Sequence, residues 1–226
     1  MENRSNDIPA NVPRNSCGSN AVIVIGRQTG SGGRQVGKAV AKKLGISYYD
    51  RELLKECAER MGYAPSIFEM ADERRPSMFR SLLAANIGLN DSSPMTMEQI
   101  YSVQSDVIRQ IADREPAVFV GRTADYILRD KPGLFSVFLH APEEWRARNM
   151  IRRLDSTSVS EAVSTLRKMD SRRQDYYNYF TPGGWGKADN YDVCIDSSRF
   201  DPDTLSEIIV RLATKANDNG PTPDDK

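Results

Sequence analysis

The stretch GRQTGSGGRQVGK, residues 26–38, directly follows the apolar run AVIVI, residues 21–25. This pattern predicts a buried strand, a glycine-rich loop and then a helix. Many α/β folds bind phosphate at such a junction, because the first amides of a helix have no acceptor within the helix. The standard phosphate loop reads G-x-x-x-x-G-K-[ST]. Here the glycines are present, but the lysine and the hydroxyl are not in their standard places, so the register has to be decided first.

Two registers of the loop are open. In the first, Lys38 is the lysine of the motif, but Ala39 then stands where a serine or threonine would bind magnesium. In the second, which we favour, residues 30–33 form the turn, Arg34 opens the helix, and backbone amides bind the anion. The residues that we predict to bind phosphate are Gly30, Ser31, Gly32, Gly33, Arg34, Gln35 and Lys38.

Two other interpretations of the same loop remain. A glycine-rich turn between a strand and a helix need not bind a ligand. A dinucleotide-binding loop needs G-x-G-x-x-G and an acid about 20 residues further on. Gly30 and Gly32 fit that motif and Asp50 lies near the required distance, but Gln35 occupies the place of the third glycine.

Apolar runs alternate with amphipathic stretches along the chain. This alternation predicts an α/β fold with a mainly parallel five-stranded sheet covered by helices on both faces. The expected strands are residues 21–25, 46–50, 117–121, 134–141 and 191–197. The expected helices are residues 34–44, 51–62, 96–116 with Thr96 as its cap, 142–154, 160–180, and 201–216 capped by Asp201.

Composition sets the domain limits and excludes several classes of function. Residues 1–19 and 217–226 are poor in core-forming side chains, so we expect disordered tails around one domain, residues 20–216. The least periodic stretch, about residues 64–95, predicts a mobile insertion or a helical hairpin. The 31 basic and 31 acidic side chains balance, which argues against a general nucleic-acid or anionic-membrane binder.

Three cysteines without a C-x-x-C pair, and a single histidine, His140, indicate reduced thiols in the cytoplasm and no multi-histidine metal site. No apolar run approaches the ~18 residues of a membrane span. The first 20 residues have no apolar segment that could serve as a signal peptide.

Four segments occur in an order that resembles one family: residues 26–54, 118–128 (VFVGRTADYIL), 137–153 (VFLHAPEEWRARNMIRR) and 191–198 (YDVCIDSS). Together they look like the cytidylate kinase-like family, a branch of the P-loop nucleoside monophosphate kinases, over about residues 21–216. The resemblance implies a P-loop NTPase-like fold in which residues 64–95 bind the monophosphate and a lid lies at about residues 148–187. It also implies ATP-dependent phosphoryl transfer to CMP or dCMP, with Mg²⁺.

The loop departs from the pattern of that family, which resembles G-P-S-G-S-G-K-G-T. Aligned on G-S-G, Arg27 stands for the first glycine, Gly33 for the lysine and Gln35 for the hydroxyl. Arg34 and Lys38, four residues apart and hence on one helix face, are the candidates to supply the missing positive charge. The alternative for both is a solvated helix surface.

The resemblance also implies residues that hold the acceptor monophosphate. In GRTADY, Arg122 matches an arginine that binds the monophosphate in this family. Its guanidinium can donate two parallel hydrogen bonds to two phosphate oxygens. Thr123 replaces the acid of the family motif, so recognition of the base by a carboxylate is lost or moves to Asp125. Asp50 matches an aspartate of the family pattern. A structural ion pair for Arg122 and a helix cap for Asp50 are the alternatives.

Arginines of the lid are the predicted catalytic residues, because phosphoryl transfer depends on positioning and charge neutralisation. In the family pattern they follow an acid, here Asp170, and Arg172 is the first candidate. A charged run on a helix is otherwise a solvated face. The predicted set is Arg172, Arg148, Arg152 and Arg173. The aromatic residues of segment 176–192 could stack on a base, although packing explains them better.

The leading hypothesis is therefore a nucleoside monophosphate kinase that uses ATP and Mg²⁺, with nucleotides as its only predicted partners and no ligand assigned to the metal. The main alternative is a regulatory or degenerate kinase that binds nucleotide without useful turnover, because the usual lysine and hydroxyl are absent. A nicotinamide-dependent oxidoreductase is a distant third, which Gln35 and the arginine-rich segments disfavour.

Overall fold

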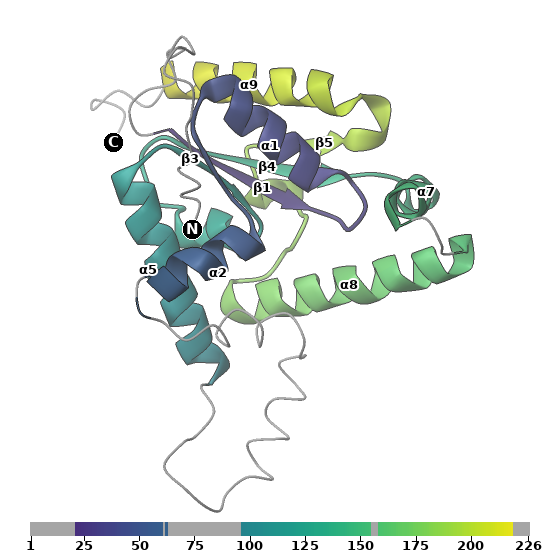
Figure 1. Ribbon diagram of the computed structural model, residues 1–226, viewed down its shortest axis with the longest axis horizontal. Helices are drawn as coiled ribbons and strands as arrows, with labels where there is room; N and C mark the ends of the chain where they lie inside the picture. The colour runs from purple at the N-terminus through teal and green to yellow at the C-terminus, as the bar shows by residue number, and fades with distance from the viewer. Residues whose placement is uncertain (1–20, 61, 63–95, 155–157, 219–226) are drawn as a thin grey trace, which may run out of the picture.

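The computed structural model describes residues 21–60, 62, 96–154 and 158–218. The predicted N-terminal tail, the predicted insertion and residues 219–226 of the predicted C-terminal tail lie outside these residues. The described part of the chain forms five strands with helices between them (Figure 1). The strands are β1 Val22–Arg27, β2 Ser47–Tyr49, β3 Ala117–Val120, β4 Leu134–His140 and β5 Val193–Asp196.

The five strands form one parallel sheet in the order β2-β3-β1-β4-β5. The predicted fold class is therefore confirmed. β1 lies at the centre and ends two residues later than predicted, because Gly26 and Arg27 still pair with Phe138 and Leu139 of β4. The carboxyl ends of all strands point to the same edge of the sheet, where open α/β sheets bind their ligands.

The helices agree closely with the prediction. The α-helices are α1 Gly33–Leu44, α2 Arg51–Arg60, α5 Met97–Arg114, α6 Ala124–Ile127, α7 Glu143–Leu154, α8 Val159–Phe180 and α9 Pro202–Asp218; short 3₁₀ helices are η1 Ala188–Asn190 and η2 Ser197–Arg199. Thr96 caps α5 through the Gln99 amide, as expected. α6 was not predicted, and α9 ends two residues later than predicted.

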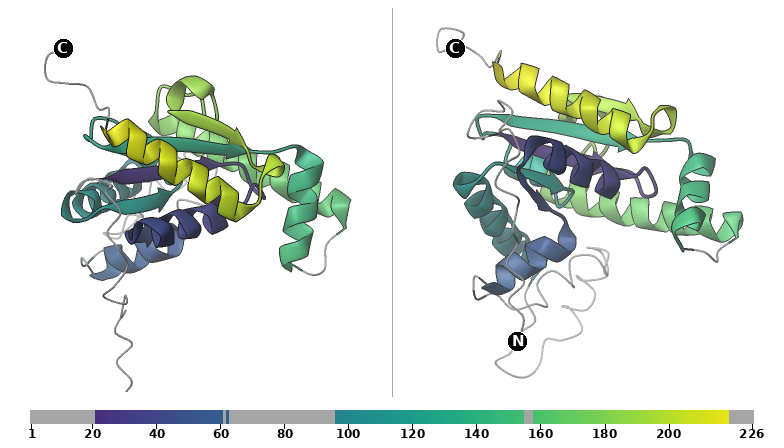
Figure 2. Two further views of the ribbon diagram at one scale, coloured as in Figure 1. Left: turned by 90° about the horizontal axis from the view of Figure 1, so that it is seen from above. Right: turned by 45° about the horizontal axis from the view of Figure 1, so that its top comes forward.

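Helices cover both faces of the sheet (Figures 1 and 2). Side chains alternate across a strand, so Ile23 and Ile25 of β1 pack under α1 and α9, whereas Val22 and Val24 pack toward α5 and α6. All four side chains are fully buried. A strand buried on both faces has to be apolar at every position, which is why AVIVI is a continuous run.

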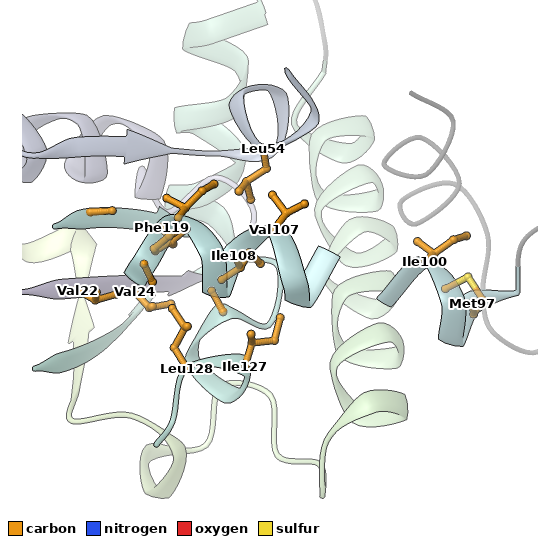
Figure 3. Close-up of a cluster of buried hydrophobic side chains, with 14 residues drawn as sticks. Val22, Val24, Leu54, Met97, Ile100, Val107, Ile108, Phe119, Ile127 and Leu128 are labelled. Atoms are coloured by element: carbon orange, nitrogen blue, oxygen red, sulfur yellow. The ribbon is translucent and has the colours of Figure 1, made fainter. Parts of the chain in front are cut away.

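The core below the sheet is built around Phe119 of β3 (Figure 3). Its ring packs with Val22 and Val24 of the sheet, Ile108 of α5 and Leu54 of α2. Each of these side chains is fully buried. Burial of an aliphatic or aromatic side chain of this size contributes about 1.5–3 kcal/mol. This cluster therefore fixes β3, and with it the loop that follows β3, against the central strand.

α7 and α8 form a helical pair at the carboxyl edge of the sheet, seen at the right of Figure 1. Ala147 of α7 packs on Ala162 and Leu166 of α8, and all three are buried. Ser158 and Glu161 form a capping box at the start of α8, which fixes where the helix begins. α8 returns from this end to the sheet, where Phe180 packs against the lower core.

Candidate active site

A cavity of about 340 Å³ lies at the carboxyl edge of the sheet, between the loop after β1, the loop after β3, and α8. Among the described residues that line it, Asp125 contributes the only carboxylate. Six arginines line the same cavity: Arg27, Arg34, Arg51, Arg122, Arg172 and Arg173. Clustered guanidinium groups in a cleft create a positive potential, so the cavity is suited to an anionic ligand.

The glycine-rich loop leads directly into α1 and adopts the second of the two registers. Gly30 and Gly32 have φ values of 80° and 86°, and α1 begins at Gly33. Lys38 lies inside α1, so it cannot belong to the loop. No side chain caps α1, in contrast to α5 and α8, which carry capping boxes. The first amides of α1 are thus suited to an anion.

The loop is clamped to the α7–α8 pair through Asp170. The Thr29 amide donates to Asp170 Oδ1 at 2.7 Å, and Arg146 Nη1 donates to Asp170 Oδ2 at 2.6 Å. Arg146, which is buried, also donates to the carbonyl oxygens of Thr29 and Ala141. Arg173 Nη1 donates to Thr29 Oγ1 at 2.7 Å. One carboxylate therefore joins the phosphate loop to both helices.

A second contact fixes the turn itself. Asn149 Nδ2 of α7 donates to the Gly30 carbonyl oxygen at 2.7 Å. A Cβ atom on Gly30 would lie 2.7 Å from the Arg146 carbonyl oxygen. The positive φ and this close approach both require glycine at position 30. The loop is held in shape from the α7 side, and its other side lines the cavity.

Arg122 and Thr123, which follow β3, have φ values of 63° and 56° and are the non-glycine residues with positive φ in the described part of the chain. Left-handed backbone at a non-glycine residue is strained, and such strain concentrates at functional sites. Both residues line the cavity. Thr123 is buried, and its Oγ1 has no hydrogen-bond partner among the described residues. This loop is therefore a candidate ligand-binding segment.

Asp125 is buried behind this loop. Burial raises the pKa of its carboxyl group, although the Tyr177 hydroxyl donates to Oδ2 at 2.8 Å and favours the ionised form. Burial and the nearby Asp125 carboxylate likewise raise the pKa of Tyr177 and of Tyr191. Asp125 therefore joins α6 to α8, in addition to lining the cavity.

The predicted phosphate-site residues separate into two groups. Gly30, Gly32, Gly33 and Arg34 line the cavity, whereas Lys38 is exposed, with its ammonium 5.7 Å from the centre of the Tyr48 ring. Ser31 is buried and Gln35 is exposed, and neither lines the cavity.

Asp50 has a structural environment. It accepts from the Leu53 amide at 3.4 Å and from the Tyr48 hydroxyl at 3.2 Å, and it lies 3.7 Å from Arg34 Nε. Burial opposes ionisation, but the Leu53 amide and the nearby partners outweigh it, so the pKa of Asp50 is lowered. Asp50 thus occupies the helix-cap position at the start of α2, and it does not line the cavity.

The predicted catalytic arginines fall into two groups, those that line the cavity and those that do not. Arg172 and Arg173 line the cavity. Arg148 and Arg152 are exposed on α7, where Arg148 pairs with Glu144 and Arg152 donates to Asn149. Neither of these two lines the cavity. The cavity therefore brings together the arginines of α8 and Arg122, and leaves those of α7 outside.

The aromatic segment mainly packs the protein. Trp185 and Tyr191 both contact the Phe138 ring, with centroid separations of 5.4 and 4.9 Å. Phe180 stacks on Tyr101 at 4.1 Å. These contacts agree with the packing interpretation of the sequence, although Trp185 and Tyr191 also line the cavity.

The roles of several site residues were missed in the sequence. Arg27 and Arg51 line the cavity, and Arg146 with Asp170 clamps the loop. Arg27 lies two residues after the apolar run, at the first glycine position of the motif, and that unusual place could have indicated a role. Nothing local distinguishes Arg146, because its partners come from distant parts of the chain.

A metal site held by side chains is not found in the described ranges: no group of three or more histidine, cysteine or acidic residues lies together there. Asp125, the only carboxylate among the described residues that line the cavity, already accepts a hydrogen bond from the Tyr177 hydroxyl. These residues do not fit a magnesium ion held by protein carboxylates, so phosphate oxygens and water would have to supply its coordination. None of the described helices is long and apolar enough to span a membrane.

A parallel sheet with a glycine-rich loop after its central strand, and an arginine-bearing helix over the same edge, defines the P-loop kinase class of fold. The model of the cytidylate kinase-like family matches residues 22–199, and the chain belongs to this family. A curated relative, a cytidylate kinase from Halobacterium salinarum, is 25% identical over 133 residues, which cover 56% of this chain and 68% of the relative.

Solved structures share the fold of this chain. An uncharacterized protein from Eubacterium ventriosum is 30% identical, with a TM-score of 0.66 over 87% of this chain and 99% of that one. A gluconokinase from Sinorhizobium meliloti has the same fold at 18% identity, with a TM-score of 0.52 over 88% of this chain and 95% of that one.

Proposed function

We propose that the protein is an ATP-dependent nucleoside monophosphate kinase whose acceptor is CMP or dCMP. The observation that carries the proposal is the arrangement of the cavity: the uncapped start of α1 lies on one side, Arg122 on another, and Arg172 and Arg173 line the space they share. A site for a phosphate donor, a site for a phosphorylated acceptor and positive charge between them are the parts that phosphoryl transfer requires.

Different residues of the cavity have different roles in this reaction. Backbone amides from Gly30 to Arg34 bind the phosphates of ATP. Arg122 holds the acceptor monophosphate through its two-pronged guanidinium. Arg172, with Arg173 beside it, neutralises the charge that develops on the transferring phosphoryl group. Membership of a kinase-like family supports ATP with Mg²⁺ as the donor.

The contacts through Asp170 and Arg173 join α8 to the loop in this mechanism. Arg173 donates to Thr29 of the loop, and Asp170 receives the Thr29 amide. Residues of α8 thus contact the loop directly, two residues from Arg172. These contacts hold Arg172 and Arg173 beside the loop that would bind the phosphates.

The choice of a cytidine nucleotide is supported by the curated cytidylate kinase from Halobacterium salinarum and by the family. The gluconokinase from Sinorhizobium meliloti supports the fold alone. An ATP-consuming reaction also fits the cytoplasmic location that an odd number of cysteines without a C-x-x-C pair predicts.

One observation favours a second function, nucleotide binding without useful turnover. Arg34 directly follows the lysine position of the motif in the sequence, and its guanidinium donates to both carboxylate oxygens of Glu52, at 2.7 and 2.6 Å. The positive charge of Arg34 is thereby paired with a carboxylate that takes no part in phosphoryl transfer.

The test is a screen of CMP, dCMP, UMP, AMP and gluconate with ATP and Mg²⁺, in which ADP formation is measured for each acceptor. The proposal expects CMP or dCMP to give the highest kcat/KM. Preferential use of another monophosphate would change the acceptor, whereas ATP binding without ADP formation would favour the regulatory function.

A further inference from the structure

The side chain of Arg27 crosses the start of α1 and reaches the loop after β3. Arg27 is the last residue of β1, is partly buried and lines the cavity. A Cβ atom on Gly33 would lie 2.8 Å from Arg27 Cγ, and one on Gly121 would lie within 1.6 Å of Arg27 Nη1. The stem of the arginine therefore passes over Gly33, and its guanidinium rests against Gly121.

This path explains why position 33 is a glycine. Gly33 is the first residue of α1, and its φ is not positive, so its backbone conformation is open to any residue. Glycine within a helix is less stable than alanine by about 0.5–1 kcal/mol. A methyl group at this position would press on the arginine stem. The glycine therefore provides the space through which Arg27 runs.

The two residues stand at the two defining positions of the phosphate loop. In G-x-x-x-x-G-K-[ST], the first glycine and the lysine are six positions apart, and that lysine reaches the β- and γ-phosphates. Those positions are Arg27 and Gly33 here. Glycine and cation have thus exchanged positions. Arg27 at the end of β1 supplies the positive charge, and Gly33 at the start of α1 leaves room for its side chain.

We propose that Arg27 takes the place of the phosphate-loop lysine and binds the terminal phosphates of ATP. This inference rests on the proposed function, in that the cavity must receive ATP. An arginine offers two parallel donors where lysine offers a point charge, so it can hold two phosphate oxygens at once.

The two cations suggested by the sequence are less suitable. Arg34 is half-exposed and paired with Glu52, and its Nε lies 3.7 Å from Asp50. Lys38 lies one turn further along α1, over the Tyr48 ring, and does not line the cavity. Arg27 is the one of the three whose stem runs over the first residue of α1.

The experiment is calorimetric titration of the full-length protein with MgATP and, separately, with CMP. Arg27→Met keeps the apolar stem over Gly33 and removes the guanidinium. It is expected to weaken ATP binding at least ~10-fold, the loss for a charge-assisted hydrogen bond, with CMP affinity changed less than ~2-fold. Arg129→Met, on an exposed arginine outside the cavity, is the control and should leave both affinities unchanged. Circular dichroism verifies folding.

A second pair of variants tests the exchange itself. Arg27→Gly should lose ATP affinity, and the double variant Arg27→Gly/Gly33→Lys, which restores the standard order of glycine and cation, should regain at least ~10-fold over the single variant. The proposal is overturned if folded Arg27→Met binds ATP as tightly as the wild type, or if the double variant binds it no better than Arg27→Gly. A wild-type protein that binds no ATP would overturn the proposed function together with this inference. A wild type that binds ATP but no CMP would overturn the acceptor alone, and the ATP titrations would still decide the role of Arg27.

Discussion

Replacement of Asp170 by asparagine should destabilise the protein strongly, because this carboxylate neutralises a buried arginine. The Arg146 side chain is 8% exposed and that of Asp170 is 14% exposed, with Arg146 Nη1 2.6 Å from Asp170 Oδ2. Removing one partner of a buried ion pair costs about 3–5 kcal/mol, since the other charge is left uncompensated. Asparagine keeps an oxygen that can accept from the Thr29 amide, so we expect the lower end, about 3 kcal/mol.

For a domain of this size, 1 kcal/mol corresponds to about 2–4 °C in Tm, so Asp170→Asn should melt about 6–12 °C below the wild type. Thermal unfolding followed by circular dichroism measures this shift. The control is Asp130→Asn, whose carboxylate pairs with Arg129 at 3.5 Å but is 87% exposed. Exposed pairs contribute about 0–1 kcal/mol, so the control should melt within about 4 °C of the wild type.

The double variant Arg146→Met/Asp170→Asn separates the charge from the packing. It removes the uncompensated arginine together with its partner, so its loss of stability should be smaller than the sum of the two single losses. Two results would show that the clamp is not the interaction that joins the loop to α7 and α8. One is an Asp170→Asn variant with the Tm of the wild type, and the other is a double variant whose loss of stability equals the sum of the two single losses.

Three further predictions concern the cavity. Arg122→Lys keeps the charge but loses the fork, so the affinity for CMP should fall ~10-fold or more while ATP affinity changes little; equal losses in separate titrations would indicate a structural role. Arg172→Ala should lower kcat at least ~100-fold with a modest change in nucleotide affinity, and an unchanged kcat would refute the catalytic assignment. Burial raises the folded-state pKa of Asp125, so its ionisation destabilises the fold as pH rises above the unfolded-state pKa. Asp125→Asn should therefore gain stability relative to the wild type as the pH rises above about 4, measured by urea unfolding, and a difference independent of pH would contradict this.

The fold could be predicted from the sequence because its determinants are local. AVIVI is apolar at every position, which indicates a strand buried on both faces, and the helix that follows has its apolar residues on one face. Thr96 with Gln99, and Gly45 after α1, mark helix ends through hydrogen bonds between near neighbours. α6 escaped prediction because four residues are too few to show a helical period.

The site was only partly predictable, because its determinants are distant in sequence. Asp170 and Thr29 are 141 positions apart, and only the packing of α8 on the sheet edge brings them together. Arg148 and Arg172 lie in similar charged runs, yet one is exposed on α7 and the other lines the cavity. The helical period gives the face of a residue on its own helix but not which neighbouring element that face meets.

Direct observation of phosphoryl transfer tests the central claim most directly. The wild-type protein is incubated with ATP, Mg²⁺ and CMP, or with dCMP in place of CMP, and the products are identified by phosphorus NMR. The account predicts that ADP and the cytidine diphosphate appear in equal amounts, and that Arg172→Ala forms them at least ~100-fold more slowly. ATP that binds at the cavity and yet remains intact with every monophosphate would contradict the account and leave a nucleotide-binding protein without kinase activity.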